Sequence, residues 1–448
     1  LTLAADRDVI AVQAVRCIGA KEFVVDVLIG GAGLGGLSAA LSLHAAGIEV
    51  RVVDAVREFR ALGVGINILP HATRELVELR LADELAATGI PTMELIYYDR
   101  FGSRICGEPR GLAAGYRWPQ YSIHRGELQM MLLHAVRQRL GADAVRTGQA
   151  VERFEYSDAR VSVELRDRRT GRLVVESADV LIGADGINSA VRAQLHPDEG
   201  PPIWNGIHLW RGLTDTEPFL GGRTMILSGA GPLVVAYPVS RIAEQRGRSV
   251  VNWGVGVRLG QPTQAPLGDW HYLGGLDDVL PHVADRSFDW LDVPALVRAA
   301  PRIWEYPMVD RNPLPHWGKG RVSLLGDAAH PMYPFGSNGG TQAIIDGRVL
   351  AWELARADDP VAGLAAYEDA RRERMNALVL SNRQRGPERV LQLVEERAPN
   401  GFAKIEDVMT NDELDSIALQ YRKTAGFDAE TLNAQPSWDV ARRGLTGG

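Results

Sequence analysis

The residues best suited to chemistry begin with a glycine-rich turn, Gly31-Ala-Gly33-Leu-Gly35-Gly36, which follows an apolar run at 23–29. In this spacing Gly31 permits a tight turn, Gly33 lets the backbone approach a pyrophosphate, and Gly36 allows a helix to pack against a strand. Backbone N–H groups at the helix start favour phosphate charge. Asp54 ends the next apolar strand, where its carboxylate can accept hydrogen bonds from ribose hydroxyls. This segment predicts a dinucleotide, either FAD or NAD.

A later segment distinguishes a flavin from a nicotinamide. The apolar run at 322–325 reads as a buried strand, and Asp327 at its carboxyl end can meet a ribityl hydroxyl. Pro334, Gly336 and Gly339 then bring a loop close to a flat group before a helix begins. The N-terminus of that helix favours negative charge at the flavin N1/C2 carbonyl. Together with the first segment, these residues predict bound FAD.

The elements needed to position these segments are also visible. Strand 23–29, helix 37–46 and strand 48–53 form a βαβ opening, and apolar strands recur at 180–182 and 322–325. The expected division is an N-terminal extension (1–22), an FAD-binding domain (23–202), a strand-rich substrate domain (203–310), a returning FAD-binding segment (311–356), and a C-terminal helical region and tail (357–448).

Bulk properties exclude several classes of function. A net charge of −7 with no dense Lys/Arg run argues against nucleic-acid binding. Cys17 and Cys106 are the only cysteines, so neither a disulfide framework nor a metal site is expected. No apolar run is long enough to span a membrane. We expect a cytoplasmic protein that binds small molecules, and the sequence does not predict its oligomeric state.

The arrangement resembles the FAD-dependent aromatic monooxygenases of the para-hydroxybenzoate hydroxylase type. Asp185-Gly186-Ile-Asn-Ser189-Ala-Val-Arg192 matches that family's Asp-Gly motif, and Gly326-Asp327 matches its Gly-Asp motif. The resemblance implies an α/β fold, with a Rossmann-like FAD-binding domain of the GR2 type, an inserted mixed β-sheet and C-terminal helices. It also implies FAD contacts for Arg125 and the backbone of Val151.

A narrower resemblance points to phenazine-tailoring hydroxylases, the 5-methylphenazine-1-carboxylate 1-monooxygenases. It rests on segments 62–68, 121–129, 235–238 and 306–311. Asp54 departs from the family, which usually has Glu there, and region 225–231 and the tail diverge. The candidate FAD contacts are Gly31, Gly33, Leu34, Gly35, Gly36, Asp54, Gly65, Ile66, Arg125, Val151, Asp185, Gly326, Asp327, Pro334, Gly336, Asn338 and Gly339.

The resemblance implies that NADH or NADPH binds transiently and reduces FAD, and that O2 then forms a flavin C4a-hydroperoxide that hydroxylates an aromatic ring. Such chemistry needs a dry pocket. The candidate pocket residues are His208, Trp210, Tyr237, Trp253, Met332, Tyr333 and Phe335. His208 and Arg211 are candidates for recognising a phenol or carboxylate. No acid–base residue is assigned, because a histidine placed like His330 more often fixes the backbone.

Three alternatives remain at this point. An FAD-dependent dehydrogenase or reductase would share the cofactor segments but transfer no oxygen. A flavin-dependent halogenase is disfavoured, because no lysine lies between Lys21 and Lys319 and no Trp-x-Trp segment occurs. A redox sensor that keeps the fold is the third. The ring that is oxidised, and whether decarboxylation accompanies hydroxylation, cannot be read from the sequence.

Overall fold

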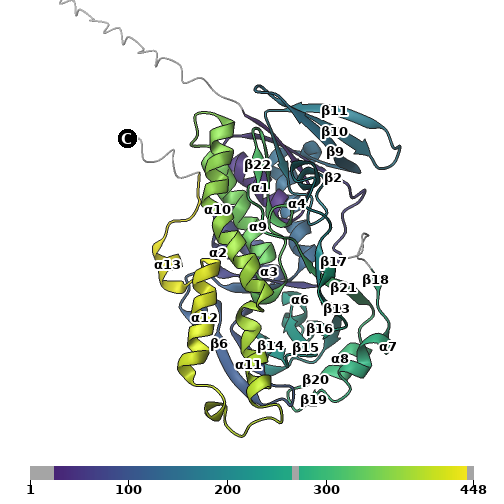
Figure 1. Ribbon diagram of the computed structural model, residues 1–448, viewed down its shortest axis with the longest axis vertical. Coiled ribbons are helices and arrows are strands. Elements are labelled where there is room, and N and C mark those ends of the chain that lie inside the picture. The colour runs from purple at the N-terminus through teal and green to yellow at the C-terminus, as the bar shows by residue number, and fades with distance from the viewer. Residues whose placement is uncertain (1–24, 265–271, 441–448) are drawn as a thin grey trace, which may run out of the picture.

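The computed structural model describes residues 25–264 and 272–440 (Figure 1). The expected N-terminal extension, residues 1–22, lies outside the described residues. Among those that are described, no helix is long and apolar enough to cross a membrane.

The cofactor segments belong to a six-stranded sheet in which every neighbouring pair is parallel except the first. Its strands, in spatial order, are β22 (Gly318–Lys319), β23 (Val322–Leu324), β12 (Val180–Gly183), β1 (Asp26–Gly30), β2 (Glu49–Asp54) and β8 (Val145–Thr147). The central strands β1 and β12 are buried along most of their length, as a parallel sheet covered on both faces requires.

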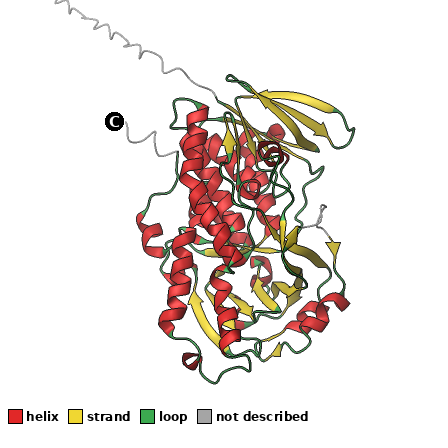
Figure 2. Ribbon diagram, viewed as in Figure 1, coloured by secondary structure: helices red, strands yellow, loops and turns green. Residues whose placement is uncertain are grey.

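Helices surround this sheet (Figure 2). Helix α1 contacts both α4 and α9, and α9 contacts α2 and α10. Their bounds are α1 (Leu34–Ala45), α2 (Pro70–Glu78), α4 (Arg125–Leu140), α9 (Gly339–Leu354) and α10 (Pro360–Arg383). The remaining helices, most of them short, are α3 (Ala82–Thr88), α5 (Ala190–Leu195), α6 (Arg241–Gln245), α7 (Leu276–Val279), α8 (Val293–Arg298), α11 (Arg389–Arg397), α12 (Asn411–Ala425) and α13 (Ala429–Ala434).

A large mixed sheet forms the second layer of the site. Its spatial order is β18 (Tyr272–Leu273), β21 (Ile303–Asp310), β13 (Ile203–Thr216), β16 (Ser249–Arg258), β15 (Leu233–Pro238), β14 (Thr224–Ser228), β5 (Glu94–Tyr98) and β6 (Arg104–Pro109), with β17 (Thr263–Gln264) beside β13. The expected substrate region 203–310 therefore supplies most of this sheet but not all. Strands β5 and β6 come from earlier in the chain. They join the sheet because β5 pairs in parallel with β14.

A small sheet lies between these layers. It consists of β3 (Gly65–Ile68), β7 (Gln120–His124) and β4 (Ile90–Thr92), paired antiparallel. Its first residue, Gly65, contacts the large sheet through a hydrogen bond from its N–H to Asn252 Oδ1 at 2.8 Å. The small sheet thus joins the two layers next to the site.

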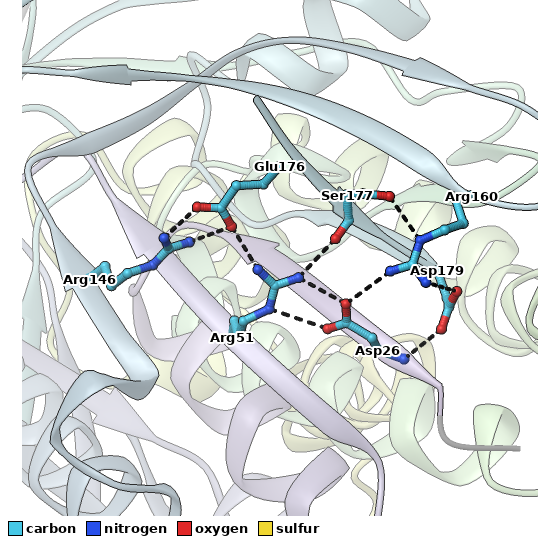
Figure 3. Close-up of polar contacts among 7 residues, drawn as sticks. All are labelled: Asp26, Arg51, Arg146, Arg160, Glu176, Ser177 and Asp179. Atoms are coloured by element: carbon cyan, nitrogen blue, oxygen red, sulfur yellow. Dashed lines mark hydrogen bonds and ion pairs between the residues drawn. The ribbon is translucent and has the colours of Figure 1, made fainter. Parts of the chain in front are cut away.

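A three-stranded antiparallel meander projects from the first sheet, at the top of Figure 1. It comprises β9 (Gln149–Tyr156), β10 (Val161–Asp167) and β11 (Leu173–Ala178), as its alternating pattern predicts. Ion pairs tie it to the amino ends of the parallel strands (Figure 3): Arg51 Nη2 lies 2.9 Å from Asp26 Oδ2, and Arg51 Nη1 lies 2.7 Å from Glu176 Oε2. Hydrogen bonding by Arg146 lowers the pKa of Glu176 despite partial burial. This network leaves the opposite, carboxyl edge of the sheet free for the site.

Candidate active site

The three cofactor segments meet because each follows one of three neighbouring parallel strands. Strand β1 ends at Gly30, β12 at Gly183 and β23 at Leu324, and these three residues are register partners across the sheet. The segments that follow therefore leave the same carboxyl edge side by side. Ligands of open parallel sheets bind at this edge.

The glycines of the first turn have different roles. Gly31 has φ +115°, and a Cβ on it would lie 2.2 Å from the carbonyl oxygen of Ala184. A Cβ on Gly36 would lie 2.0 Å from the carbonyl oxygen of Gly31. A Cβ on Gly33 would meet no protein atom within 4 Å. Gly31 and Gly36 are therefore required by the fold itself, whereas Gly33 keeps space free above the turn.

Two helix N-termini point at this space. Helix α1 starts after Gly33 and α9 starts after Asn338, and neither has a side chain that caps its first N–H groups. Gly33 and Gly339 both line the same cavity. The unpaired N–H groups and the helix dipoles therefore give this cavity two positive ends, which suit a phosphate and a reduced flavin.

The cavity has an empty volume of about 1500 Å³, including its open mouth. One side, which we call the cofactor wall, consists of Gly33, Leu34, Arg125, Ala184, Asp327 and Gly339. The other side, the sheet wall, consists of Leu209, Arg211, Met225, Leu227, Leu233, Val235 and Tyr237. The cavity therefore has two chemically different walls.

The cofactor wall fits FAD on three independent observations. The position above Gly33 is open, two uncapped helix N-termini face the space, and the Asp327 side chain is exposed to it. Surrounding protein desolvates Asp327 and raises its pKa, although His330 and Arg125 oppose this effect. A ligand hydroxyl beside this carboxylate would be a favourable hydrogen-bond donor.

Comparison with known proteins agrees with this geometry. The family model described as "FAD binding domain" matches residues 24–210 and 300–381, which leaves out strands β14 to β18 of the large sheet and the helices after α10. Phenazine 1,6-dicarboxylic acid hydroxylase PhzS of Lysobacter antibioticus is 50% identical over 80% of this chain and 89% of its own length. 3-Hydroxybenzoate 6-hydroxylase 1 of Aquipseudomonas alcaligenes is 31% identical over 77% and 84%. The chain belongs to the FAD-dependent aromatic hydroxylases.

Solved structures support the same assignment. Klebsiella pneumoniae HpxO complexed with FAD and uric acid has a TM-score of 0.67 and 26% identity, covering 93% of this hydroxylase and 96% of that chain. The expected α/β fold with its mixed sheet and C-terminal helices is confirmed. FAD is the cofactor, and NAD(P)H is the reductant typical of this family.

Most candidate FAD contacts of the hydroxylase line the cavity. These are Gly33, Leu34, Gly35, Gly36, Gly65, Ile66, Arg125, Gly326, Asp327, Pro334 and Gly339. The others are absent from its lining: Gly31, Asp54, Val151, Asp185, Gly336 and Asn338. For this second group, direct contact with FAD stays a prediction.

The two carboxylates of the second group hold the loops. Asp54 accepts hydrogen bonds from the N–H groups of Ala32 and Val56, each at 2.7 Å. Asp185 accepts one from Ala190 N at 2.8 Å, and burial raises the pKa of Asp185. Both residues therefore shape the turns that follow β2 and β12.

The remaining members of this group pack against neighbours. Gly336 has φ +65°, and a Cβ on it would lie 2.2 Å from the Tyr421 hydroxyl. Asn338 donates to that hydroxyl at 3.0 Å. Val151 lies against Gly30, where a Cβ would meet it at 2.7 Å. The loop before α9 is thus pinned to the C-terminal helix α12, a contact that the family motifs do not reveal.

Arg192 of the Asp-Gly motif joins two cofactor segments. Its side chain is 1% exposed, and its Nη1 donates to the carbonyl oxygens of Ala328 and Ala329, each at 2.9 Å. Glu199 pairs with the same guanidinium. The buried charge is therefore paired, and it fixes the loop that carries Asp327.

His330 fixes the backbone, as the more common role of such a histidine predicts. Its Nε2 lies 2.6 Å from Asp346 Oδ2, which also accepts from Gly326 N at 3.0 Å. Burial alone would raise the pKa of Asp346, yet His330 and Arg371 lower it to about 2. His330 is absent from the cavity lining. The structure offers no support for a role as general base.

The sheet wall follows the alternation of strand residues. On β15, Leu233, Val235 and Tyr237 face the cavity, while Val234 and Ala236 pack into the core behind the sheet. Of the candidate pocket residues, Tyr237, Met332 and Phe335 line the cavity. Burial raises the pKa of Tyr237, although the neighbouring Arg211 opposes this.

The other candidate pocket residues do not line this cavity. Trp210 and Trp253 point to the opposite face of the sheet, where Trp253 Nε1 donates to Thr214 Oγ1 at 3.1 Å. His208 Nδ1 pairs with Glu305 Oε1 at 2.8 Å. Tyr333 packs in a small cluster that includes Phe335. These tryptophans are therefore core residues. The sequence predicts that strand residues alternate between two faces, but it does not predict which face meets the ligand.

Several cavity residues were not anticipated from the sequence. Leu209 and Met308 lie on strands, where alternation from a known pocket residue would have found them. Asn67 lies two residues after Gly65 on β3. Glu388 carries no sequence signal, because it lies beyond residue 381, where the family match ends.

Proposed function

We propose that this hydroxylase acts on a planar aromatic carboxylic acid of the phenazine class, with NAD(P)H and O2 as co-substrates. The observation that carries the proposal is Arg211, the one charged side chain among the residues of the sheet wall. Its Nη2 donates to the Gly65 carbonyl oxygen at 2.6 Å, which holds the guanidinium at the boundary between the two walls. A single fixed positive charge beside a flat apolar surface suits an aromatic ring that bears a carboxylate.

The similarity to the Lysobacter antibioticus phenazine 1,6-dicarboxylic acid hydroxylase supports the same substrate class. Other relatives named for hydroxybenzoate or hydroxynicotinate share only 28–31% identity. A tricyclic or similarly extended ring is therefore the substrate we favour.

Bound FAD supplies the redox chemistry, accepting a hydride and activating O2 so that one oxygen atom enters the ring. The chain itself binds and orients. The glycine turn and the N-terminus of α1 hold phosphates, and the N-terminus of α9 stabilises negative charge on the reduced ring system. Leu209, Leu227 and Val235 exclude water from the space between cofactor and substrate. Arg211 orients the substrate.

The test is a substrate panel with the FAD-loaded protein. Phenazine carboxylates, 3-hydroxybenzoate, 6-hydroxynicotinate and urate would each be supplied with NADH or NADPH, and oxidation of the nicotinamide would be followed. Isotopically labelled O2 would show whether the product gains oxygen. We expect a phenazine carboxylate to accelerate flavin reduction most and to yield a labelled hydroxylated product. Stimulation by none of these compounds, or reduction without labelled product, would overturn the proposal and favour a reductase.

A further inference from the structure

A second, smaller cavity lies beside the sheet wall, against α12 and the turn before α11; we call it the inner cavity. It shares Met225, Leu227, Ser337 and Glu388 with the large cavity, so these residues form the partition between them. Its other polar lining residues are Tyr97, Glu108, Arg110, Gln120, Tyr421 and Arg422. The inner cavity is therefore polar, although it adjoins the mainly apolar sheet wall.

Three buried polar atoms around the inner cavity make no hydrogen bond within the described residues. They are Tyr97 Oη, Arg110 Nε and Glu388 Oε2. Leaving such an atom unsatisfied costs about 1–3 kcal/mol. The centre of a water molecule can occupy about 20 Å³ of this cavity. One ordered water needs roughly 10–15 Å³ of such space and two to four polar partners. The inner cavity therefore has both the room and the partners for ordered water.

Glu388 is the residue that connects this water site to the substrate space. It is 6% exposed, and its Oε1 accepts a hydrogen bond from Gly336 N at 3.0 Å. This bond uses only one oxygen and fixes the side chain against the loop before α9. Burial raises the pKa of Glu388 to about 7, while Arg110 lowers it and Glu108 raises it. A carboxyl group with such a pKa exchanges its proton readily at neutral pH.

A chain of groups continues from the inner cavity toward solvent. Arg110 Nη2 lies 3.1 Å from Glu108 Oε2, and Arg422 Nη1 lies 3.3 Å from the same oxygen. The Arg422 side chain is 29% exposed. Burial raises the pKa values of Tyr97 and Tyr421, so both stay neutral hydroxyls beside Glu388. The exchangeable proton on this path therefore belongs to Glu388.

We propose that Glu388 accepts the proton that the substrate ring loses on hydroxylation and passes it through water in the inner cavity to the surface. This rests on the proposed function. After oxygen has entered the ring, the C–H bond at that carbon breaks, its electron pair restores the aromatic ring, and the proton forms an O–H bond with the Glu388 carboxylate. Glu388 then returns to its charged form by releasing the proton to water near Glu108. The apolar sheet wall leaves no other buried carboxylate on that side of the large cavity among the described lining residues.

The first experiment needs no aromatic substrate. The carboxyl band of FAD-loaded protein would be titrated by infrared difference spectroscopy across about two pH units on either side of neutrality. We expect a protonated carboxyl that titrates near neutral pH, that is absent from Glu388→Gln and that persists in Glu396→Gln, which alters an exposed glutamate on α11, the helix that follows Glu388. A wild-type spectrum without such a band would overturn the proposal.

The second experiment uses whichever compound is hydroxylated by the wild-type protein. Glu388→Gln keeps the acceptor for Gly336 N but cannot take up a proton, so we expect kcat to fall by about 100-fold and its ionisation near neutral pH to disappear. Tyr97→Phe, which removes one water partner, should lower kcat less and leave the pH profile in place. Unchanged kcat and pH profile in Glu388→Gln would exclude the proton-transfer role. If no compound is hydroxylated, the proposed function is wrong. The infrared titration still tests Glu388 in that case, because it needs no substrate.

Discussion

The two walls of the large cavity are built in different ways. The cofactor wall is mainly backbone: strand ends, a glycine turn and the first turns of α1 and α9. The sheet wall is made of every second side chain along strands β13, β14 and β15 of the large sheet. Backbone can only approach a ligand closely where glycine occurs at a set spacing, whereas many side chains can form an apolar surface. The cofactor wall therefore has a recognisable sequence motif, and the sheet wall has none.

The largest effect is expected within the glycine turn. Gly33→Val should leave the fold intact, because its Cβ meets no protein atom, but should lower FAD affinity by more than about 100-fold by filling the phosphate space. Gly36→Ala should instead prevent folding or reduce stability severely, since its Cβ would lie 2.0 Å from the Gly31 carbonyl oxygen. Flavin absorbance and thermal unfolding of the purified proteins would separate the two. A yellow Gly33→Val protein would contradict the placement of the pyrophosphate.

A smaller effect on the same wall is expected at Asp327. Its carboxylate is exposed to the cavity, so Asp327→Ala removes a ligand contact without opening a packed core. We expect FAD to bind roughly 10-fold more weakly, as the loss of a charge-assisted hydrogen bond implies, with little change in the unfolding temperature of the FAD-free protein. Flavin fluorescence titration measures the affinity. Equal affinity in wild type and variant would remove Asp327 from the cofactor wall.

The smallest effects are expected for two aromatic residues of the large sheet, Tyr237 and Trp253. Comparing their substitutions tests directly which face of the sheet meets the ligand. Tyr237→Phe alters the sheet wall beside Arg211, so we expect a several-fold change in KM and more NAD(P)H oxidised per product formed. Trp253→Phe lies on the opposite face and should cost about 1–3 kcal/mol in unfolding free energy with KM unchanged. Denaturant unfolding and steady-state kinetics would be measured for both. A changed KM in Trp253→Phe alone would reverse the assignment of the two faces.

Local patterns predicted much of the fold. The βαβ opening, the meander from 149 to 178 and helix α9 all lie close to where glycine spacing and hydrophobic periodicity place them. Within the predicted C-terminal helical region, α10 and α11 are separate helices, and the chain breaks between them where Arg385 adopts φ +69°. The pairing of β5 with β14, and the docking of α12 on the loop at Gly336, depend on contacts between distant segments. No local pattern encodes them.

The site divides in the same way. Gly33 and Asp327 could be placed at the cofactor because each follows a buried strand, and Arg125 could be placed there only through the family resemblance. Trp210 could not be distinguished from its neighbours Leu209 and Arg211, because the phase of β13 is set by what covers each face. Glu388 could not be found at all, since its burial arises from tertiary packing.

The order of the central strands also has a consequence for biosynthesis. Strand β1 pairs with β12, and β12 pairs with β23, which begins only at Val322. The FAD pocket therefore cannot be completed until most of the chain has left the ribosome. Until then the glycine turn of the early βαβ unit stays exposed to solvent. Long-range pairing of this kind folds slowly. FAD binds only to the completed pocket and stabilises the folded state. The supply of FAD should therefore influence what fraction of the newly made protein folds rather than aggregates.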